Sequence, residues 1–226
     1  MLIKQGGVYE PQTLNDIIFG NPESKLRIYD IVTGAEPLPS SGKSAILLYG
    51  VYGTGKTTMA KMLPDALEKG KTGLEVNMPA DFIGCQQGLN GPQVMDLIGK
   101  ITSTNSFNTS GLHYIIIDEV DNLTKQAQAS LKSALNCQRC IFVLTTNNIS
   151  LLDRGMLDRC VLVEMNAAND AQLLPIAHQL LKDIGVDISD AELLPTIRAA
   201  NGSLRNISHN VRRLIQRQNI PSNIIF

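Results

Sequence analysis

A glycine-rich stretch between two apolar segments carries the strongest chemical signal in the sequence. It reads Gly50-Val51-Tyr52-Gly53-Thr54-Gly55-Lys56-Thr57-Thr58 and matches the pattern Gly-x-x-x-x-Gly-Lys-[Ser/Thr]. Its glycines let backbone N–H groups curl around phosphate oxygens, and the helix expected behind it points its positive end at them. Lys56 is expected to reach the β- and γ-phosphates, and Thr57 to place its hydroxyl on Mg²⁺. The residues expected to contact the nucleotide are Gly50, Tyr52, Gly53, Thr54, Gly55, Lys56, Thr57 and Thr58.

The flanks of this loop favour a phosphate site over a plain flexible connection. The apolar run 45–49 precedes the loop and residues 59–63 have helical character, which is the strand–loop–helix context that the pattern requires. The sequence therefore predicts that ATP binds here together with Mg²⁺.

An apolar run that ends in acidic residues supplies the second half of the predicted site. Residues 113–117 read as a buried parallel strand, which would deliver Asp118 and Glu119 to its carboxyl end. Asp118 is expected to hold Mg²⁺, and Glu119 to orient and activate the attacking water. Two acids are needed because the metal holder is electrostatically occupied. The alternative is a strand capped by a solvated acidic turn.

Strands and helices alternate through most of the chain, which predicts a parallel sheet covered on both faces. The expected strands are residues 45–49, 74–77, the apolar run within 113–121 that ends in acidic residues, 141–148 ending in polar amides, and 161–163; the expected helices are 23–32, 58–67, 92–101, 123–135 and a short one within 151–160. Beyond residue 169 the strand patterns stop, and three helical stretches follow at 173–184, 191–200 and 204–218. The predicted fold class is α/β, with a P-loop sheet domain at 1–166 and a helical lid at 167–226.

Composition limits the possible partners and compartments. With 20 basic and 21 acidic residues the net charge is −1, so any DNA site must be a local patch. No signal-peptide pattern or bilayer-length apolar window is present, so we expect no membrane partner and a cytoplasmic location. Cys137 and Cys140 have zinc-ligand spacing but lack a second pair, which favours packing as small hydrophobes over metal or redox use.

Together these motifs resemble the AAA+ ATPases, and within them the small ATPase subunits of replication clamp loaders. The opening Tyr9-Glu10-Pro11-Gln12-Thr13-Leu14-Asn15-Asp16-Ile17 looks like the family segment that lines the adenine pocket. That resemblance implies nucleotide contacts from Tyr9, Pro11, Ile17 and Ile18. The stretch 74–77 matches the family's second strand. Residues 123–131 look like the helix after the acidic pair, where a Gln couples the nucleotide site to DNA.

The resemblance also implies three further site residues. Asn147 resembles the first sensor, which contacts the γ-phosphate or the attacking water. Asp158-Arg159-Cys160 is similar to a Ser-Arg-Cys motif whose arginine completes a neighbouring subunit's site, so Arg159 is expected to act in trans. Arg205, after Gly202-Ser203-Leu204, resembles the second sensor. For each of the three the alternative is structural: a strand end for Asn147 and surface charges for the arginines. Asp158 and Ser203 depart from the family pattern.

The function expected from this resemblance is an oligomeric ATPase acting in DNA replication as a clamp-loader-like subunit. It would assemble with itself or with other AAA+ subunits, grip primed or single-stranded DNA without base readout, and act on a sliding clamp or a helicase. One alternative is a helicase loader or transposition-type ATPase of a phage or mobile element, and another is a non-catalytic, nucleotide-gated scaffold.

The end of the chain affects the expected assembly. The sequence stops at Phe226, just past the lid, whereas clamp-loader subunits continue into a helical collar domain. We therefore expect assembly that depends on ATP, DNA or a partner rather than a stable five-membered loader. The apolar tail 224–226 (Ile224, Ile225 and Phe226) is expected to fold back onto the lid, and docking to a clamp is the alternative.

Overall fold

The computed structural model describes residues 11–85, 90–182 and 185–218, and the chain divides into two compact units. Within those ranges, the α/β unit comprises residues 21–50 and 56–165, and the helical unit comprises 11–20, 51–55 and 166–218. The structure thus groups two short segments, 11–20 and 51–55, with the C-terminal helices. The predicted domain boundary between residues 166 and 167 stays a prediction.

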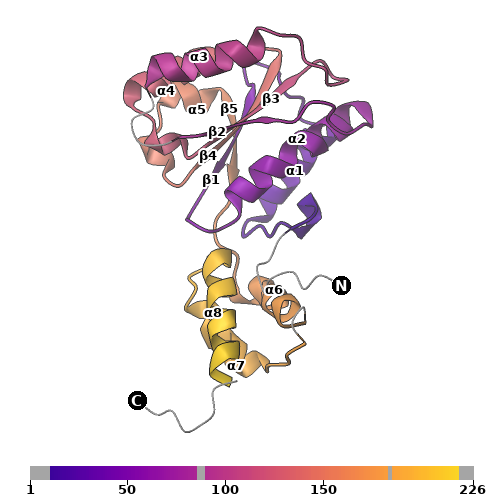
Figure 1. Ribbon diagram of the computed structural model, residues 1–226, viewed down its shortest axis with the longest axis vertical. Coiled ribbons are helices and arrows are strands. Elements are labelled where there is room, and N and C mark those ends of the chain that lie inside the picture. The colour runs from indigo at the N-terminus through magenta and orange to yellow at the C-terminus, as the bar shows by residue number, and fades with distance from the viewer. Residues whose placement is uncertain (1–10, 86–89, 183–184, 219–226) are drawn as a thin grey trace. The chain divides into compact units, whose positions relative to one another are not determined.

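The α/β unit contains a five-stranded sheet in which every pair of neighbouring strands is parallel (Figure 1). Its elements are α1 (Pro22–Thr33), β1 (Ala45–Tyr49), α2 (Lys56–Thr72), β2 (Asp81–Gly84), α3 (Gly91–Thr102), β3 (His113–Asp118), α4 (Lys125–Ala134), β4 (Cys140–Thr146), α5 (Arg154–Asp158) and β5 (Cys160–Glu164). The strand order is β2-β3-β4-β1-β5. This confirms the predicted fold class and places β4 between β3 and β1.

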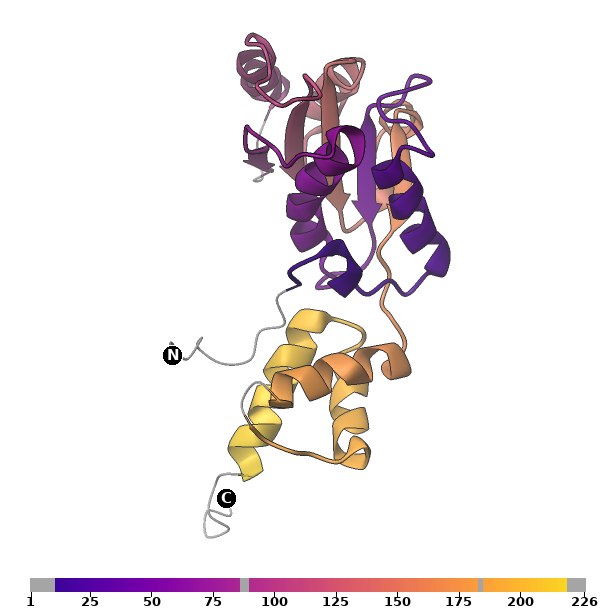
Figure 2. The same cartoon turned by 90° about the vertical axis from the view of Figure 1, so that its right-hand side faces the viewer.

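Helices cover both faces of the sheet. Side chains along a strand alternate between the two faces, and on one face Leu47, Ile117 and Leu144 form a core with residues of α3, α4 and α5. Helices α1 and α2 pack together, and Figure 2, seen from their side, shows the strands behind them. Because both faces are covered, β3 and β4 are buried along almost their whole length.

The second strand lies later in the sequence than predicted, so the prediction of a strand at residues 74–77 is wrong. Strand β2 is Asp81–Gly84, which pairs in parallel with β3 from Ile115 to Asp118. Instead of joining a sheet, the backbone N–H groups of Asn77 and Met78 both donate to Asn108 Oδ1, at 3.0 and 2.9 Å. A side chain thus satisfies the donors that a strand would present to its neighbour.

The helical unit is built from α6 (Asp170–Lys182), α7 (Asp190–Arg198) and α8 (Leu204–Gln218). Their apolar faces meet in one core that includes Leu173, Leu193 and Ile207. Ile18 packs against this core, and Phe19 O accepts a hydrogen bond from Gln172 Nε2 at 3.2 Å. These two contacts explain why segment 11–20 belongs with the helices. Among the described residues, no helix is both long and apolar enough to cross a bilayer.

A fully buried carboxylate, Glu68 on α2, joins three parts of the α/β unit. Its Oε1 accepts the Ser110 backbone N–H at 2.8 Å, and its Oε2 accepts the hydroxyls of Ser110 at 2.5 Å and Tyr114 at 2.8 Å. Burial, followed by the hydrogen bond to Glu68, raises the pKa of Tyr114 above its usual range. One side chain therefore connects α2, the loop before β3 and β3 itself.

Replacing Glu68 should destabilise the fold. Glu68→Ala leaves the Tyr114 hydroxyl and the Ser110 amide without their acceptor, so we expect the free energy of unfolding to fall by about 2–4 kcal/mol. Urea denaturation at pH 7 measures this change. Asp65→Ala, on the exposed face of the same helix, is the control and should change stability by less than about 0.5 kcal/mol. Equal stabilities of Glu68→Ala and wild type would refute the structural role of Glu68.

Candidate functional site

The glycine-rich loop connects β1 to α2. Gly53 and Gly55 adopt φ values of 78° and 90°, in the left-handed region that glycine tolerates best. A Cβ at Gly53 would lie 2.2 Å from Ser203 Oγ, so no side chain fits there without movement. Gly53 O also accepts the backbone N–H of Leu204, the first residue of α8, at 2.9 Å. Residues 51–55 are therefore tied to the start of the last helix.

Lys56 is the first residue of α2, and its side chain folds back along the loop. Only 6% of it is exposed, and its Nζ donates to Gly50 O at 2.8 Å. Thr54 Oγ1 similarly donates to Val51 O at 3.1 Å. Thr58 and Tyr52 are exposed. The loop thus places a buried ammonium group beside its own backbone, where a phosphate would need it.

Thr57 and Asp118 lie together, as the sequence predicts for two residues that share a metal. Thr57 Oγ1 donates to Asp118 Oδ1 at 2.9 Å and approaches Oδ2 at 3.2 Å. Asp118 ends β3 and Thr57 follows β1, so the parallel sheet brings both to its carboxyl edge. A hydroxyl and a carboxylate are hard oxygen donors of the kind that Mg²⁺ takes, usually in company with phosphate and water oxygens. The donor set therefore fits Mg²⁺.

An all-protein metal cage is a different arrangement, and the described ranges do not contain one. Among residues 11–85, 90–182 and 185–218, no group of three or more His, Cys, Asp or Glu side chains could hold a metal ion. Cys137 Sγ and Cys140 Sγ lie 3.3 Å apart as free thiols. Burial raises the pKa of Cys140, which keeps it protonated and agrees with packing as a small hydrophobe.

Glu119 follows Asp118 with a left-handed backbone, at φ 59° and ψ 52°. This conformation is uncommon for a residue other than glycine and ends the strand abruptly. The Glu119 side chain is exposed, and its Oε2 accepts from Asn122 Nδ2 at 3.2 Å. The two carboxylates therefore have different surroundings. Asp118 accepts a hydrogen bond from the Thr57 hydroxyl, whereas the Glu119 side chain is exposed to solvent.

Thr145 of β4 is a member of this site that sequence reasoning missed. Its hydroxyl donates to Asp118 Oδ1 at 2.6 Å and accepts the Glu119 backbone N–H at 2.9 Å. The strand order places β4 directly beside β3, which explains the contact. The available signal was a pair of threonines, Thr145 and Thr146, directly before Asn147, in a strand that is apolar up to Leu144.

Asn147 directly follows β4 and is half-buried at the same edge of the sheet. Its backbone N–H donates to Asp121 Oδ1 at 3.4 Å. Since β3 and β4 are parallel neighbours with Ile117 opposite Leu144, Asn147 lies at the same end of the sheet as Asp118, three residues beyond the last residue of β4 that pairs with β3. Its role as a sensor stays a prediction.

Arg159 lies at the other end of the sheet. It immediately precedes Cys160, the first residue of β5, whereas Asp118 is the last residue of β3. Because all five strands are parallel, Arg159 lies at the amino ends of the strands and Asp118 at their carboxyl ends. The two ends are separated by a strand length of roughly 16 Å. The structure therefore does not bring Arg159 to the site formed by Lys56 and Asp118 of the same chain.

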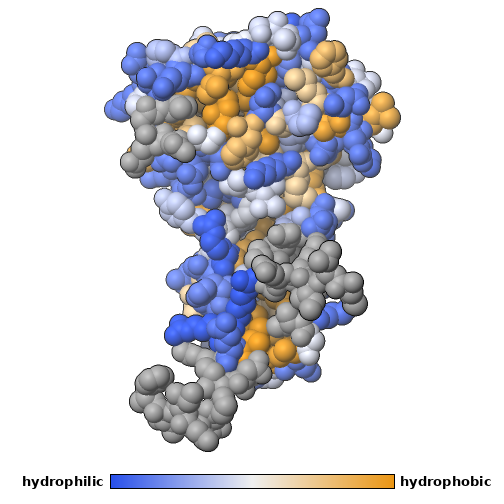
Figure 3. Space-filling model, viewed as in Figure 1, coloured by the Kyte–Doolittle hydropathy of each residue, from blue (hydrophilic) through white to orange (hydrophobic). Residues whose placement is uncertain are grey.

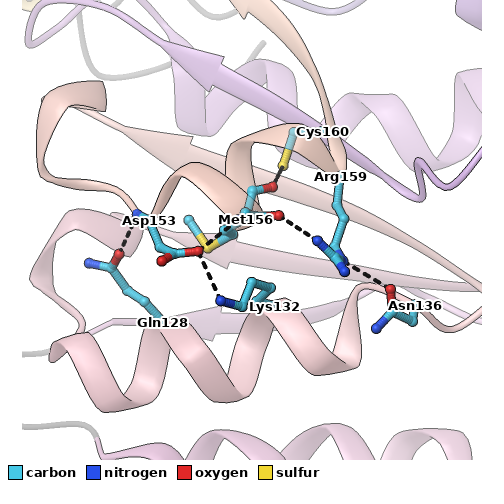
Figure 4. A network of polar contacts seen from close by, with 8 residues as sticks. Gln128, Lys132, Asn136, Asp153, Met156, Arg159 and Cys160 are labelled. Carbon is cyan, nitrogen blue, oxygen red and sulfur yellow. Dashed lines mark hydrogen bonds and ion pairs between the residues drawn. The ribbon is translucent and has the colours of Figure 1, made fainter.

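The guanidinium of Arg159 is held by two acceptors on neighbouring elements (Figure 4). Its Nε donates to Asn136 Oδ1 at 2.9 Å, and its Nη1 donates to Gly155 O at 2.7 Å. Within the described part of the chain, no hydrogen bond or ion pair involves Nη2. The side chain is thus fixed in direction with donors to spare.

Helix α4 anchors the α5 turn that carries Arg159. Gln128 Oε1 accepts the Asp153 N–H at 2.9 Å, and its Nε2 donates to the carbonyls of Leu123 and Leu151 at 3.3 Å each. Lys132 pairs with Asp153, whose carboxylate also caps the start of α5 (Figure 4). Gln128 is the buried Gln of the stretch 123–131, and it connects the segment after the acidic pair to α5.

The remaining predicted nucleotide contacts belong to the helical unit. Arg205 is exposed on the first turn of α8, next to Leu204, whose amide binds Gly53. Ile17 is buried and Ile18 half-buried, as is Pro11. Tyr9 and the tail 224–226 lie outside the described residues. These contacts stay predictions.

Residues 46–166, more than half of the chain, match the family described as "ATPase family associated with various cellular activities (AAA)". The chain belongs to this family. It is therefore an ATPase whose fold binds a nucleotide. The assignment of that nucleotide to the loop 50–58 and Asp118 stays a prediction.

The chain is similar to curated replication factor C subunits over most of its length. It is 28% identical to human Replication factor C subunit 5 and 26% identical to Replication factor C small subunit 2 of Pyrobaculum islandicum, in each case over 87% of this chain. It spans 56% and 59% of the lengths of these relatives. It is an AAA+ ATPase related to the replication factor C small subunits.

A solved structure agrees with the fold. The Thermotoga maritima RuvB Holliday junction branch migration motor superposes with a TM-score of 0.67 at 21% identity, covering 92% of this chain and 65% of that chain. At this identity the likeness concerns the architecture, a parallel sheet followed by a helical part.

Removing the Lys56 ammonium group should abolish nucleotide binding. Lys56→Ala takes away the buried positive charge that is predicted to contact the phosphates, and we expect ATP affinity to fall at least about 100-fold. Fluorescent-nucleotide titration or calorimetry measures this. Lys61→Ala, an exposed residue of the same helix, is the matched control and should bind like wild type. An unchanged affinity in Lys56→Ala would rule out the loop as the ATP site.

Proposed function

We propose that the chain is a clamp-loader-like subunit that assembles with copies of itself or related subunits, binds ATP and Mg²⁺, and grips DNA together with a partner protein. The observation that carries the assembly is the position of Arg159 at the sheet edge opposite to Lys56 and Asp118. An arginine held there with unused donors suits the phosphates of a neighbouring subunit. The relationship to replication factor C subunits supports DNA and a clamp as partners.

In the proposed reaction the chain's own residues bind, orient and move a proton. Lys56 and the loop amides hold the β- and γ-phosphates, and Thr57 with Asp118 would hold Mg²⁺, which supplies neutralising charge when bound. Glu119 accepts the proton of the attacking water, and Asn147 orients that water at the same edge. Arg205 contacts the phosphates from the lid. The neighbour's Arg159 adds donors as charge disperses over the phosphoryl oxygens.

The DNA contact in this proposal is to the backbone, without base readout. A net charge of −1 gives no long-range attraction, so binding would depend on a local surface and on assembly. ATP would thus control DNA binding by controlling the oligomer.

Steady-state ATPase assays under three conditions test the biological part of the proposal. We expect low turnover alone, and stimulation that requires both primed DNA and a sliding clamp. Stimulation by DNA alone would favour a helicase-loader or transposition-type ATPase instead. Absence of turnover in every condition would favour a nucleotide-gated scaffold and refute the hydrolytic role of Glu119.

Mixing two inactive variants tests the trans role of Arg159. Arg159→Ala should bind ATP normally but lose at least about 100-fold in kcat, and Lys56→Ala should be inactive for lack of nucleotide. A mixture should regain activity, because intact loops of the first variant meet intact arginines of the second. Normal turnover by dilute, monomeric Arg159→Ala, or a mixture without any recovery, would contradict the proposal.

The contact from Asn136 should matter to the same step. Asn136→Leu removes the acceptor of Arg159 Nε on an exposed position, and we expect kcat to fall about 10-fold with little change in ATP affinity. Asn136→Asp keeps an acceptor oxygen and should retain most of the activity. In the Arg159→Ala background, Asn136→Leu should have no further effect, as a double-mutant cycle would measure. Additive losses would show that Asn136 does not act through Arg159.

A further inference from the structure

We propose that Thr145 is a positioning residue of the ATPase site, whose single hydroxyl fixes Asp118 and Glu119 relative to each other. The inference rests on the proposed roles of these two acids. It adds a residue that no motif marks, on a strand that carries neither acid.

The hydroxyl of Thr145 is used in both directions. It donates to Asp118 Oδ1 at 2.6 Å and accepts the Glu119 N–H at 2.9 Å, and only 1% of the residue is exposed. A hydroxyl has one donor and two acceptor positions, so these two bonds are compatible. In a buried place the two bonds polarise each other and strengthen. Two consecutive hydrogen bonds therefore connect the Glu119 amide, through the Thr145 hydroxyl, to the Asp118 carboxylate.

The backbone of Glu119 explains why such a clamp is needed. Residues in a continuing strand would point Asp118 and Glu119 to opposite faces of the sheet. The left-handed conformation of Glu119 breaks the strand at this point, and non-glycine residues persist in that region only where their surroundings hold them. The bond from the Glu119 N–H to Thr145 is a direct restraint on that conformation. Thr145 thus fixes the backbone position from which the side chain of Glu119, the proposed proton acceptor, extends.

Asp118 is held from a second side by Thr57. Thr57 belongs to α2 and Thr145 to β4, so the carboxylate receives O–H donors from two different elements. The Thr57 hydroxyl is also the one suited to Mg²⁺, whereas the Thr145 hydroxyl is already engaged with Glu119. Thr145 is therefore the donor that serves orientation alone.

Two substitutions separate the hydroxyl from the rest of the side chain. Thr145→Val keeps the branched shape that suits a buried strand and removes the hydroxyl, whereas Thr145→Ser keeps the hydroxyl. For Thr145→Val we expect kcat to fall about 10–100-fold, KM for ATP to change less than about 3-fold, and more Mg²⁺ to be needed for half-maximal rate. Thr145→Ser should stay within about 3-fold of wild type in each quantity.

Amide hydrogen exchange, measured by NMR, gives a readout that needs no catalysis. The Glu119 N–H should exchange at least about 10-fold faster in Thr145→Val than in wild type or Thr145→Ser, because its acceptor is gone. ATP affinity without Mg²⁺ should be the same in all three proteins. Melting temperatures identify any variant that does not fold, and Thr145→Ala then replaces Thr145→Val as the hydroxyl-free protein.

The outcomes distinguish this inference from the proposed function. Wild-type kcat in a folded, hydroxyl-free variant would overturn the positioning role, and so would unchanged exchange at Glu119. Equal losses in Thr145→Val and Thr145→Ser would overturn it as well, because they would indicate packing rather than the hydroxyl. If the wild type itself shows no turnover, the proposed function fails, while the exchange measurement still tests the Thr145 clamp.

Discussion

The common direction of the five strands is the constraint on which the rest of the structure depends. Parallel pairing sends every carboxyl end to one edge, so the loop after β1, Asp118 after β3 and Asn147 after β4 gather there. The same pairing sends every amino end to the opposite edge, which is where Arg159 lies. Neither grouping could arise from a sheet with reversed strands. Strand direction therefore decides which of these side chains can lie near one another within one chain and which lie apart.

Hydroxyl groups do much of the fine positioning within this frame. Thr57 and Thr145 approach one carboxylate from two elements, and Glu68 gathers hydroxyls in the same way far from the site. Each such bond is short-ranged and neutral on the donor side, so it directs an oxygen without altering the net charge of its surroundings. Substitution by an apolar residue of equal size would leave the fold's outline intact and the oxygen unguided.

Much of this arrangement could be predicted from the sequence because its signals are local. The loop 50–58 and the acidic residues after residue 117 each follow directly on an apolar run that predicts a strand. The same short stretch of sequence therefore predicts both the functional residues and the element that positions them. The second strand could not be placed in this way, since residues 74–77 and 81–84 are equally short and edge strands have no strong apolar pattern. In the structure, the side chain of Asn108, distant in sequence, accepts the backbone N–H groups of Asn77 and Met78, and residues 81–84 pair with β3 instead. Thr145 and Asn136 escaped for a related reason, because their importance lies in the neighbour across the sheet or turn.

The separation of Arg159 from the loop around Lys56 has a consequence for any assembly that uses both. Such a contact joins unlike surfaces, so it has a polarity and repeats head to tail. A closed ring would complete a site at every junction. An open spiral would instead leave one terminal subunit with a loop but no incoming arginine, and the opposite terminal subunit with an arginine but no loop to serve. In an open spiral, the terminal subunit without an incoming arginine would then bind its nucleotide without hydrolysing it. That subunit would lie at the gap between the two ends of the spiral.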